Sequence, residues 1–169
     1  AFASMNYPPL AESGVHLNFN QDFLEVPTHT KKLIIRKNLC SDIVIIKLFP
    51  GISMKVIESI LNIKGIKGVI LETYGAGNAP SNKEFVGLIS DAISKGIYII
   101  NVTQCVGGSV LLGHYETSSQ LKEIGVIDAK DMTTESATAK LMYLLGIGVK
   151  KDEFVLYYEQ SLRGEITNK

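Results

Sequence analysis

The sequence has few of the residues that build covalent frameworks or metal sites. Among 169 residues there are two cysteines, three histidines and no tryptophan. Two cysteines, Cys40 and Cys105, are too few for a disulfide framework, and they predict reduced thiols in a cytosolic protein. No histidines form a ligand-like pair, so we expect no metal site.

The sequence also has no excess of one charge and no long apolar run. The 17 basic and 17 acidic residues balance to a net charge of zero. Without a basic excess to neutralise phosphates, nucleic acid is an unfavourable partner. No apolar run has the length needed to cross a bilayer, and the first residues lack the basic and apolar regions of a secretory signal. We therefore expect a cytoplasmic protein with no membrane partner.

The middle of the chain alternates between two hydrophobic patterns. Short apolar runs at residues 43–48, 68–71 and 97–102 predict strands. Helical spacing of apolar residues over 54–61 and 85–93 predicts helices between them. This alternation predicts an α/β fold, a three-layer flavodoxin-like domain with a small, mainly parallel sheet covered by helices on both faces.

Weaker signals flank this region. The tetrapeptide at residues 81–84, SNKE, has the form of a capping box with Ser81 as the helix cap, and Gly96 is placed to end that helix. A short strand near 125–127 and helices over about 134–145 and 152–160 follow. The runs at 16–19 and 33–35 are candidates for edge strands.

Ligands of open parallel sheets bind beyond the carboxyl ends of the strands, which selects the loops at 49–53, 73–81 and 103–110. The second loop contains Gly75, Gly77 and Asn78, and the third contains TQC followed by two glycines. These residues also favour plain turns and local backbone contacts, so both a structural and a binding interpretation stay open. The segment GAGNAP is not a dinucleotide motif, because Pro80 occupies the place of the third glycine.

Neither the thiols nor the histidines form an evident catalytic pair. Cys105 has only His114 nearby in the sequence, and a buried, inert thiol is the commoner state. His16 and His29 lie in the N-terminal part, where we expect them at the surface.

Several motifs, in order, resemble the C-terminal domain of the type I (cytoplasmic) L-asparaginases. They are YGAGNAP at residues 74–80, NVTQC at 101–105, GVI at 125–127, DMTTE at 131–135 and LRGE at 162–165. The resemblance implies that residues 1–14 are an interdomain connecting segment and that 15–169 form the C-terminal domain.

The resemblance also implies where the chemistry lies. The family hydrolyses L-asparagine to L-aspartate and ammonia with a threonine nucleophile, and its catalytic groups belong to a larger N-terminal domain. The signature TGGTI of that domain is absent here. We therefore expect no catalytic residue and no cofactor in this chain, and no activity from it alone. Its expected partners are the N-terminal domain, L-asparagine and further subunits, in a homodimer or a dimer of dimers.

By motif position the resemblance implies two sets of site residues. Asn78 and Tyr115 are expected to reach the substrate in a neighbouring subunit. An effector site, which binds activating asparagine in some members, is expected at Thr103, Gln104, Cys105, Tyr74, Gly77 and Glu72. Those members have an arginine where this chain has Glu72. Replacing a cation by an anion disfavours an effector carboxylate, so we expect asparagine activation to be lost.

Three alternatives remain. The chain could be a free-standing domain that binds a small metabolite, or the asparaginase-like subunit of a tRNA-dependent amidotransferase. It could also belong to a larger mammalian-type relative with further modules.

Overall fold

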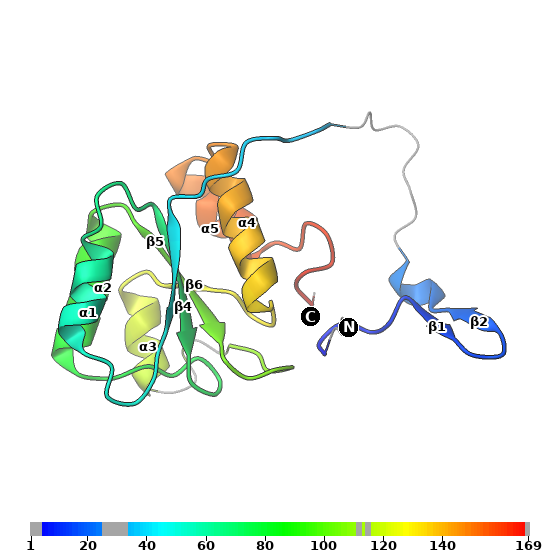
Figure 1. Ribbon diagram of the computed structural model, residues 1–169, viewed down its shortest axis with the longest axis horizontal. Coiled ribbons are helices and arrows are strands. Elements are labelled where there is room, and N and C mark those ends of the chain that lie inside the picture. The colour runs from blue at the N-terminus through cyan, green and yellow to red at the C-terminus, as the bar shows by residue number, and fades with distance from the viewer. Residues whose placement is uncertain (1–4, 25–33, 111–112, 114–115, 168–169) are drawn as a thin grey trace.

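A four-stranded parallel sheet forms the centre of the molecule. The computed structural model describes residues 5–24, 34–110, 113 and 116–167. Neighbouring strands pair in parallel in the order β3-β4-β5-β6 (Figure 1). Their bounds are β3 Ile43–Lys47, β4 Gly68–Thr73, β5 Tyr98–Thr103 and β6 Ile127–Asp128. The three predicted strands and the short fourth one are thus confirmed, with bounds shifted by one or two residues.

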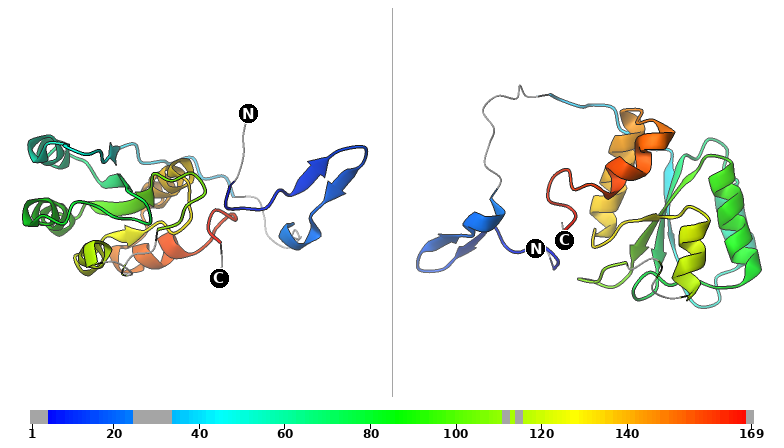
Figure 2. Two further views of the ribbon diagram at one scale, coloured as in Figure 1. Left: turned by 90° about the horizontal axis from the view of Figure 1, so that it is seen from below. Right: turned by 180° about the vertical axis from the view of Figure 1, so that it is seen from behind.

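The helices cover both faces of this sheet (Figure 2). Because the strand order is sequential, right-handed crossovers place the connecting helices on one common face. These are α1 (Met54–Leu61), α2 (Lys83–Ser94) and α3 (Glu116–Glu123). The opposite face is covered by α4 (Thr134–Gly146) and α5 (Lys151–Glu159), which follow the last strand. The three-layer α/β arrangement is confirmed.

Side chains of the central strands alternate between two cores. Along β4, Val69 and Leu71 pack towards α1 and α2, whereas Ile70 packs towards α4 and α5. All three are fully buried. This alternation follows from the two-residue repeat of a strand, and each such side chain contributes about 1.5–3 kcal/mol on burial. Two covered faces explain why the strands read as continuous apolar runs.

The ends of α2 depart slightly from the sequence prediction. Asn82, rather than Ser81, is the N-cap, and its Oδ1 accepts a hydrogen bond from the Phe85 backbone N–H at 2.7 Å. Both residue types favour caps, so the predicted position was wrong by one residue. Gly96 follows the helix with φ +89°, as predicted for the glycine that ends it.

A small hairpin near the N-terminus lies apart from the sheet (Figure 1). Strand β1 (Ala11–Ser13) pairs antiparallel with β2 (Leu17–Phe19), and the short 3₁₀ helix η1 (Gln21–Phe23) follows. The run at 16–19 therefore forms a strand, but it pairs with β1 and is no edge of the main sheet. Ile34 and Ile35 are exposed and form no strand, while Leu33 lies outside the described residues.

Candidate functional site

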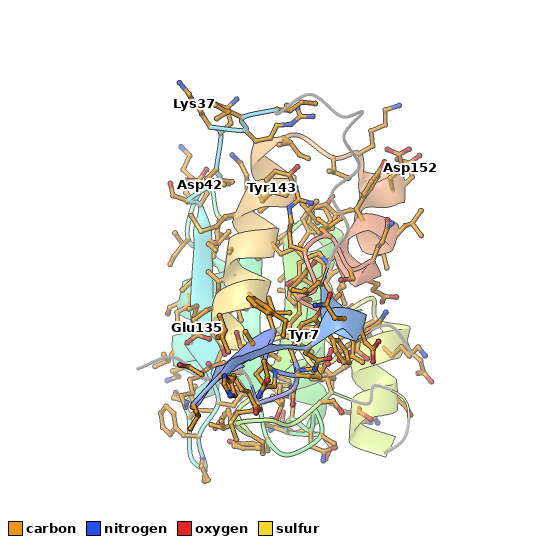
Figure 3. The ribbon with its side chains drawn as sticks, turned by 90° about the vertical axis from the view of Figure 1, so that its right-hand side faces the viewer. Tyr7, Lys37, Asp42, Glu135, Tyr143 and Asp152 are labelled. Carbon is orange, nitrogen blue, oxygen red and sulfur yellow. The ribbon has the colours of Figure 1, made fainter. Side chains whose placement is uncertain are left out.

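A cleft of about 800 Å³ lies at the carboxyl edge of the sheet. We call it the edge cleft. Its walls come from the ends of β4 and β5, the start of α4, the N-terminal segment and the C-terminal tail. The lining includes Met5, Asn6, Tyr7, Glu72, Thr103–Gly107, Asp131, Thr133–Ser136, Arg163–Glu165 and Thr167. Figure 3 views the molecule from the side of the hairpin and labels Tyr7 and Glu135, which contribute two of these walls.

Contacts between distant segments hold the walls of the edge cleft together. The Asn6 side-chain amide donates to the carbonyls of Gly108 and Asp131, both at 2.9 Å. The Asp131 carboxylate in turn accepts from the Thr167 backbone N–H at 3.0 Å. The sheet has no reversal of strand order to open a crevice, so these segments supply it instead.

Glu72, near the end of β4, is held inside the edge cleft by two neighbours. Its Oε1 accepts from the Thr134 hydroxyl at 2.6 Å, and its Oε2 lies 3.4 Å from the Lys47 Nζ. The Glu72 side chain is 12% exposed, whereas that of Lys47 is 65% exposed. The carboxylate therefore has a hydroxyl donor at the start of α4 and a solvated cation on the edge strand.

The hydrogen bonds of Thr103 and Gln104 tie loops together. The Gln104 amide donates to the carbonyls of Leu48 and Glu72, at 2.7 and 2.9 Å. The Thr103 hydroxyl donates to the Gly75 carbonyl at 2.5 Å and accepts from the Cys105 N–H at 3.0 Å. Both residues thus satisfy backbone groups, as the structural interpretation expects, while also lining the edge cleft.

Both cysteines are free thiols. Cys40 is buried, and Cys105 is exposed in the edge cleft. The expectation that Cys105 is buried was wrong, because the chain turns outward after β5 and exposes residues 105–107. His114, its only candidate partner in the sequence, lies outside the described residues.

The loop from Tyr74 to Asn78 is closed by its own backbone. Tyr74 N donates to Asn78 O and Asn78 N donates to Tyr74 O, each at 2.8 Å. Gly77 has φ +103°, and a Cβ there would lie 2.7 Å from Val110 Cγ1. Both the backbone conformation and the lack of space therefore require glycine at this position.

The structure thus brings together four of the six predicted effector residues. Glu72, Thr103, Gln104 and Cys105 line the edge cleft. Tyr74 and Gly77 are not among its lining residues, and Tyr74 packs against the core beneath α1 and α2.

The remaining predicted positions lie elsewhere. Asn78 is partly buried and is also not part of the lining. Tyr115 and His29 lie outside the described residues. His16 is exposed on the hairpin, as expected.

Sequence reasoning missed a buried ion pair that anchors the C-terminal wall of the cleft. Lys140 Nζ lies 2.6 Å from Glu165 Oε1, and the two side chains are 3% and 13% exposed. Lys140 also donates to the Gln160 carbonyl at 2.6 Å. The Glu165 carboxylate accepts from the backbone N–H groups of Leu162 and Arg163. In the sequence the tail motif LRGE indicates only the family, and no spacing rule connects Glu165 with Lys140.

The pKa values of Lys140 and Glu165 are both lowered, but for different physical reasons. Burial lowers the pKa of Lys140, and the attraction of Glu165 offsets this only in part. Burial opposes ionisation of Glu165 as well. Hydrogen bonds from Lys140 and from the Leu162 and Arg163 N–H groups outweigh burial, so the pKa of this carboxyl lies below its ordinary 4.5. The extra backbone donors explain why the carboxylate is the better stabilised partner.

Several chemical features can be compared among the described residues. Within these ranges no three His, Cys, Asp or Glu side chains come close enough to hold a metal ion. The Thr103 hydroxyl is bonded to backbone groups, and the Thr133 hydroxyl accepts from the Ser136 N–H. The Thr133 hydroxyl also bonds the Glu135 carboxylate, and the pKa of that carboxyl lies below its ordinary value, so it is a poor base for a threonine nucleophile. None of the described helices is long and apolar enough to cross a membrane.

Known proteins match nearly the whole chain. L-asparaginase 1 of Escherichia coli (strain K12) is 38% identical over 167 residues, which are 99% of this chain and 49% of that protein. A glutamyl-tRNA(Gln) amidotransferase subunit of Pyrococcus abyssi is 30% identical over 170 residues, which are 99% of this chain and 38% of that protein. The crystal structure of L-asparaginase I from Vibrio cholerae has a TM-score of 0.91 at 36% identity, covering 99% of this chain and 50% of that one.

The chain spans about half the length of the E. coli and V. cholerae relatives. Residues 42–157, which contain the four-stranded sheet, α1 to α4, most of α5 and much of the edge cleft, match the model of the glutaminase/asparaginase C-terminal domain. The resemblance seen in the sequence motifs is therefore confirmed, and the chain belongs to the glutaminase/asparaginase C-terminal domain family.

Proposed function

We propose that this chain is the C-terminal part of a cytoplasmic L-asparaginase that hydrolyses L-asparagine to L-aspartate and ammonia. The observation that carries the proposal is the match of nearly the whole chain to half of two L-asparaginases. Both free thiols suit a reducing compartment. Residues 1–14 are proposed as the connecting segment and 15–169 as the domain, with the β1–β2 hairpin falling across this boundary.

In this proposal the chain contributes binding and assembly, and the catalytic groups lie in an N-terminal domain. Asn78 and Tyr115 complete the substrate site of a neighbouring subunit in a homodimer or dimer of dimers. The closed loop from Tyr74 to Asn78 supports this role for Asn78, since its backbone hydrogen bonds present a rigid residue. Losing an amide contact to a charged substrate group costs about 1.5–3 kcal/mol, or roughly 10–150-fold in affinity.

The edge cleft is proposed as the effector site of the family, altered in this chain. Glu72, Thr103, Gln104 and Cys105 line it, whereas Tyr74 and Gly77 are not among its lining residues. An anionic carboxylate at position 72 repels the carboxylate of an amino acid. We therefore propose that asparagine does not activate this enzyme through the edge cleft.

Two other functions fit the observations less well. An amidotransferase subunit acts on a tRNA-bound substrate, and the net charge of zero gives this chain no basic excess for RNA. Identity is also lower to the P. abyssi amidotransferase protein than to the E. coli asparaginase. A free-standing metabolite-binding domain needs no second half, whereas both asparaginase relatives have one.

The test compares two proteins from the same gene. One contains residues 1–169 alone, and the other extends the chain upstream by about its own length. We expect ammonia release from L-asparagine only by the longer protein, because nucleophile activation and oriented attack need the upstream residues. Activity of the shorter protein above a heat-killed control would show that the catalytic residues are misassigned. An inactive but folded longer protein would contradict the proposed reaction.

A further inference from the structure

Two polar side chains are fully buried in the sheet, Thr73 at the end of β4 and Asn101 within β5. The Thr73 hydroxyl donates to Asn101 Oδ1 at 2.6 Å, and Asn101 Nδ2 donates to the Gly77 carbonyl at 3.1 Å. Burying an amide costs stability unless its groups are paired, and the neighbours of Asn101 along β5 are apolar. An apolar side chain of similar size would need no hydrogen-bond partners in this position. What the asparagine adds is its hydrogen bond to the Gly77 carbonyl.

That contact acts on a single peptide unit. Gly77 C=O and Asn78 N–H belong to one planar group. Its carbonyl accepts from Asn101, and its N–H donates to the Tyr74 carbonyl at 2.8 Å. With both ends bonded, the plane cannot rotate freely, and the direction in which the Asn78 side chain leaves the backbone is set.

The fit between Asn101 and the loop leaves little room for alternatives. A Cβ at Gly77 would lie 3.1 Å from Asn101 Nδ2. The Gly77 carbonyl determines which end of the amide faces the loop, because a carbonyl only accepts hydrogen bonds and therefore selects Nδ2. An amide turned over would place Oδ1 against the Gly77 carbonyl, where two acceptors repel.

From these contacts we infer that Asn101 is a positioning residue for Asn78, and that Thr73 supports it by pairing the buried amide oxygen of Asn101. The inference rests on the proposed role of Asn78 in binding substrate. Asn101 itself touches no substrate in this scheme, and its effect on catalysis passes through the Gly77–Asn78 peptide.

A double-mutant cycle in the longer protein tests this route. The variants are Asn78→Ala, Asn101→Leu and the two combined, and the measurement is kcat/KM for L-asparagine. We expect each single variant to lose roughly tenfold or more, equivalent to ~1.4 kcal/mol or more of transition-state binding. If Asn101 acts only through Asn78, the double variant is no worse than Asn78→Ala.

The outcomes separate the two proposals. If the loss of kcat/KM in the double variant equals the product of the two single losses, the inference is overturned. It is also overturned if Asn78→Ala lowers kcat/KM and Asn101→Leu leaves it unchanged. An unchanged kcat/KM for Asn78→Ala would instead remove the proposed substrate role of Asn78, and the inference with it.

Controls distinguish positioning from general destabilisation. Thr73→Ser keeps the hydroxyl and should retain kcat/KM. Thr73→Val removes the hydroxyl and should lower kcat/KM, as Asn101→Leu does. Leu144→Ala weakens the opposite core and should lower the melting temperature without changing kcat/KM. Hydrogen–deuterium exchange should accelerate in the peptide spanning residues 74–80 of Asn101→Leu but not in α4. Equal acceleration in both regions would mean that Asn101 is only a stability residue.

Discussion

The buried pair of Lys140 and Glu165 allows a sharp test of what anchors the C-terminal wall of the edge cleft. In Glu165→Gln the Lys140 ammonium stays buried without a counter-ion and is left with neutral partners, the new amide and the Gln160 carbonyl. The Arg163 N–H also loses the anionic oxygen to which it donates at 2.6 Å. Removing one member of a buried pair typically costs about 3–5 kcal/mol.

This cost can be measured as a thermal shift. For a domain of this size, each kcal/mol corresponds to about 2–4 °C, so we expect a fall of about 6–20 °C in Tm by circular dichroism or calorimetry. The double variant Lys140→Met with Glu165→Gln removes the uncompensated charge and should be at least as stable as Glu165→Gln alone. A cost for Glu165→Gln below about 1 kcal/mol, the range of exposed pairs, would refute the conclusion that this pair is desolvated.

The same pair predicts the direction of a pH effect. The folded-state pKa of Glu165 lies below its ordinary 4.5, so its ionised form adds stability above that pH. That contribution is lost as the pH falls through the folded-state pKa. The difference in unfolding free energy between the original chain and Glu165→Gln should therefore be full above pH 4.5 and shrink below it. A difference that stays constant through the acid range would contradict the assignment.

Three further predictions concern single side chains. Gly77→Ala should lower the free energy of unfolding by about 1–3 kcal/mol, because φ at this position is positive and Val110 fills the space. The matched control Gly87→Ala, inside α2, meets nothing within 4 Å and should raise the free energy of unfolding by up to ~1 kcal/mol. Urea unfolding measures both changes. Asn82→Ala should lower the free energy of unfolding by about 1 kcal/mol, and Ser81→Ala should leave it nearly unchanged, because Asn82 is the residue that caps α2. Equal losses in the two variants would contradict this cap. In the longer protein, steady-state kinetics on L-asparagine should be hyperbolic, and a sigmoidal curve abolished by Thr103→Asn would contradict the loss of activation proposed for Glu72.

The strands and most helices were predictable because their signals are local. The β-branched runs of β3 and β5 lie between helices with regular apolar spacing, and a covered parallel sheet is the arrangement that buries both. Helix α3 was missed because its eight residues, ETSSQLKE, contain a single large apolar side chain, Leu121. That leucine is buried in the core beneath α1 and α2, a contact that sequence periodicity does not reveal.

The candidate site was predictable only on the side that the strands provide. The rule for parallel sheets selected the loops 49–53, 73–81 and 103–110, and only the last of them contributes residues to the edge cleft. Glu72, which also lines the cleft, lies one residue before the second loop. The other walls come from Tyr7, Thr134 and Arg163, which are far from these residues in the sequence. Their arrangement depends on Asn6 and Asp131 hydrogen bonds between segments more than 100 residues apart, and no short-range pattern encodes such contacts.

The surroundings of Glu72 also change how its charge should be understood. By motif position alone, residue 72 is a single exchange of arginine for glutamate. In the structure the carboxylate accepts from Thr134 and pairs with Lys47, so three groups form one unit. An arginine placed here alone would face the Lys47 ammonium, and like charges at such a distance repel. The anion at position 72 and the lysine on the edge strand thus stabilise each other, and Lys47 offsets part of the repulsion that we propose between the Glu72 carboxylate and an effector carboxylate.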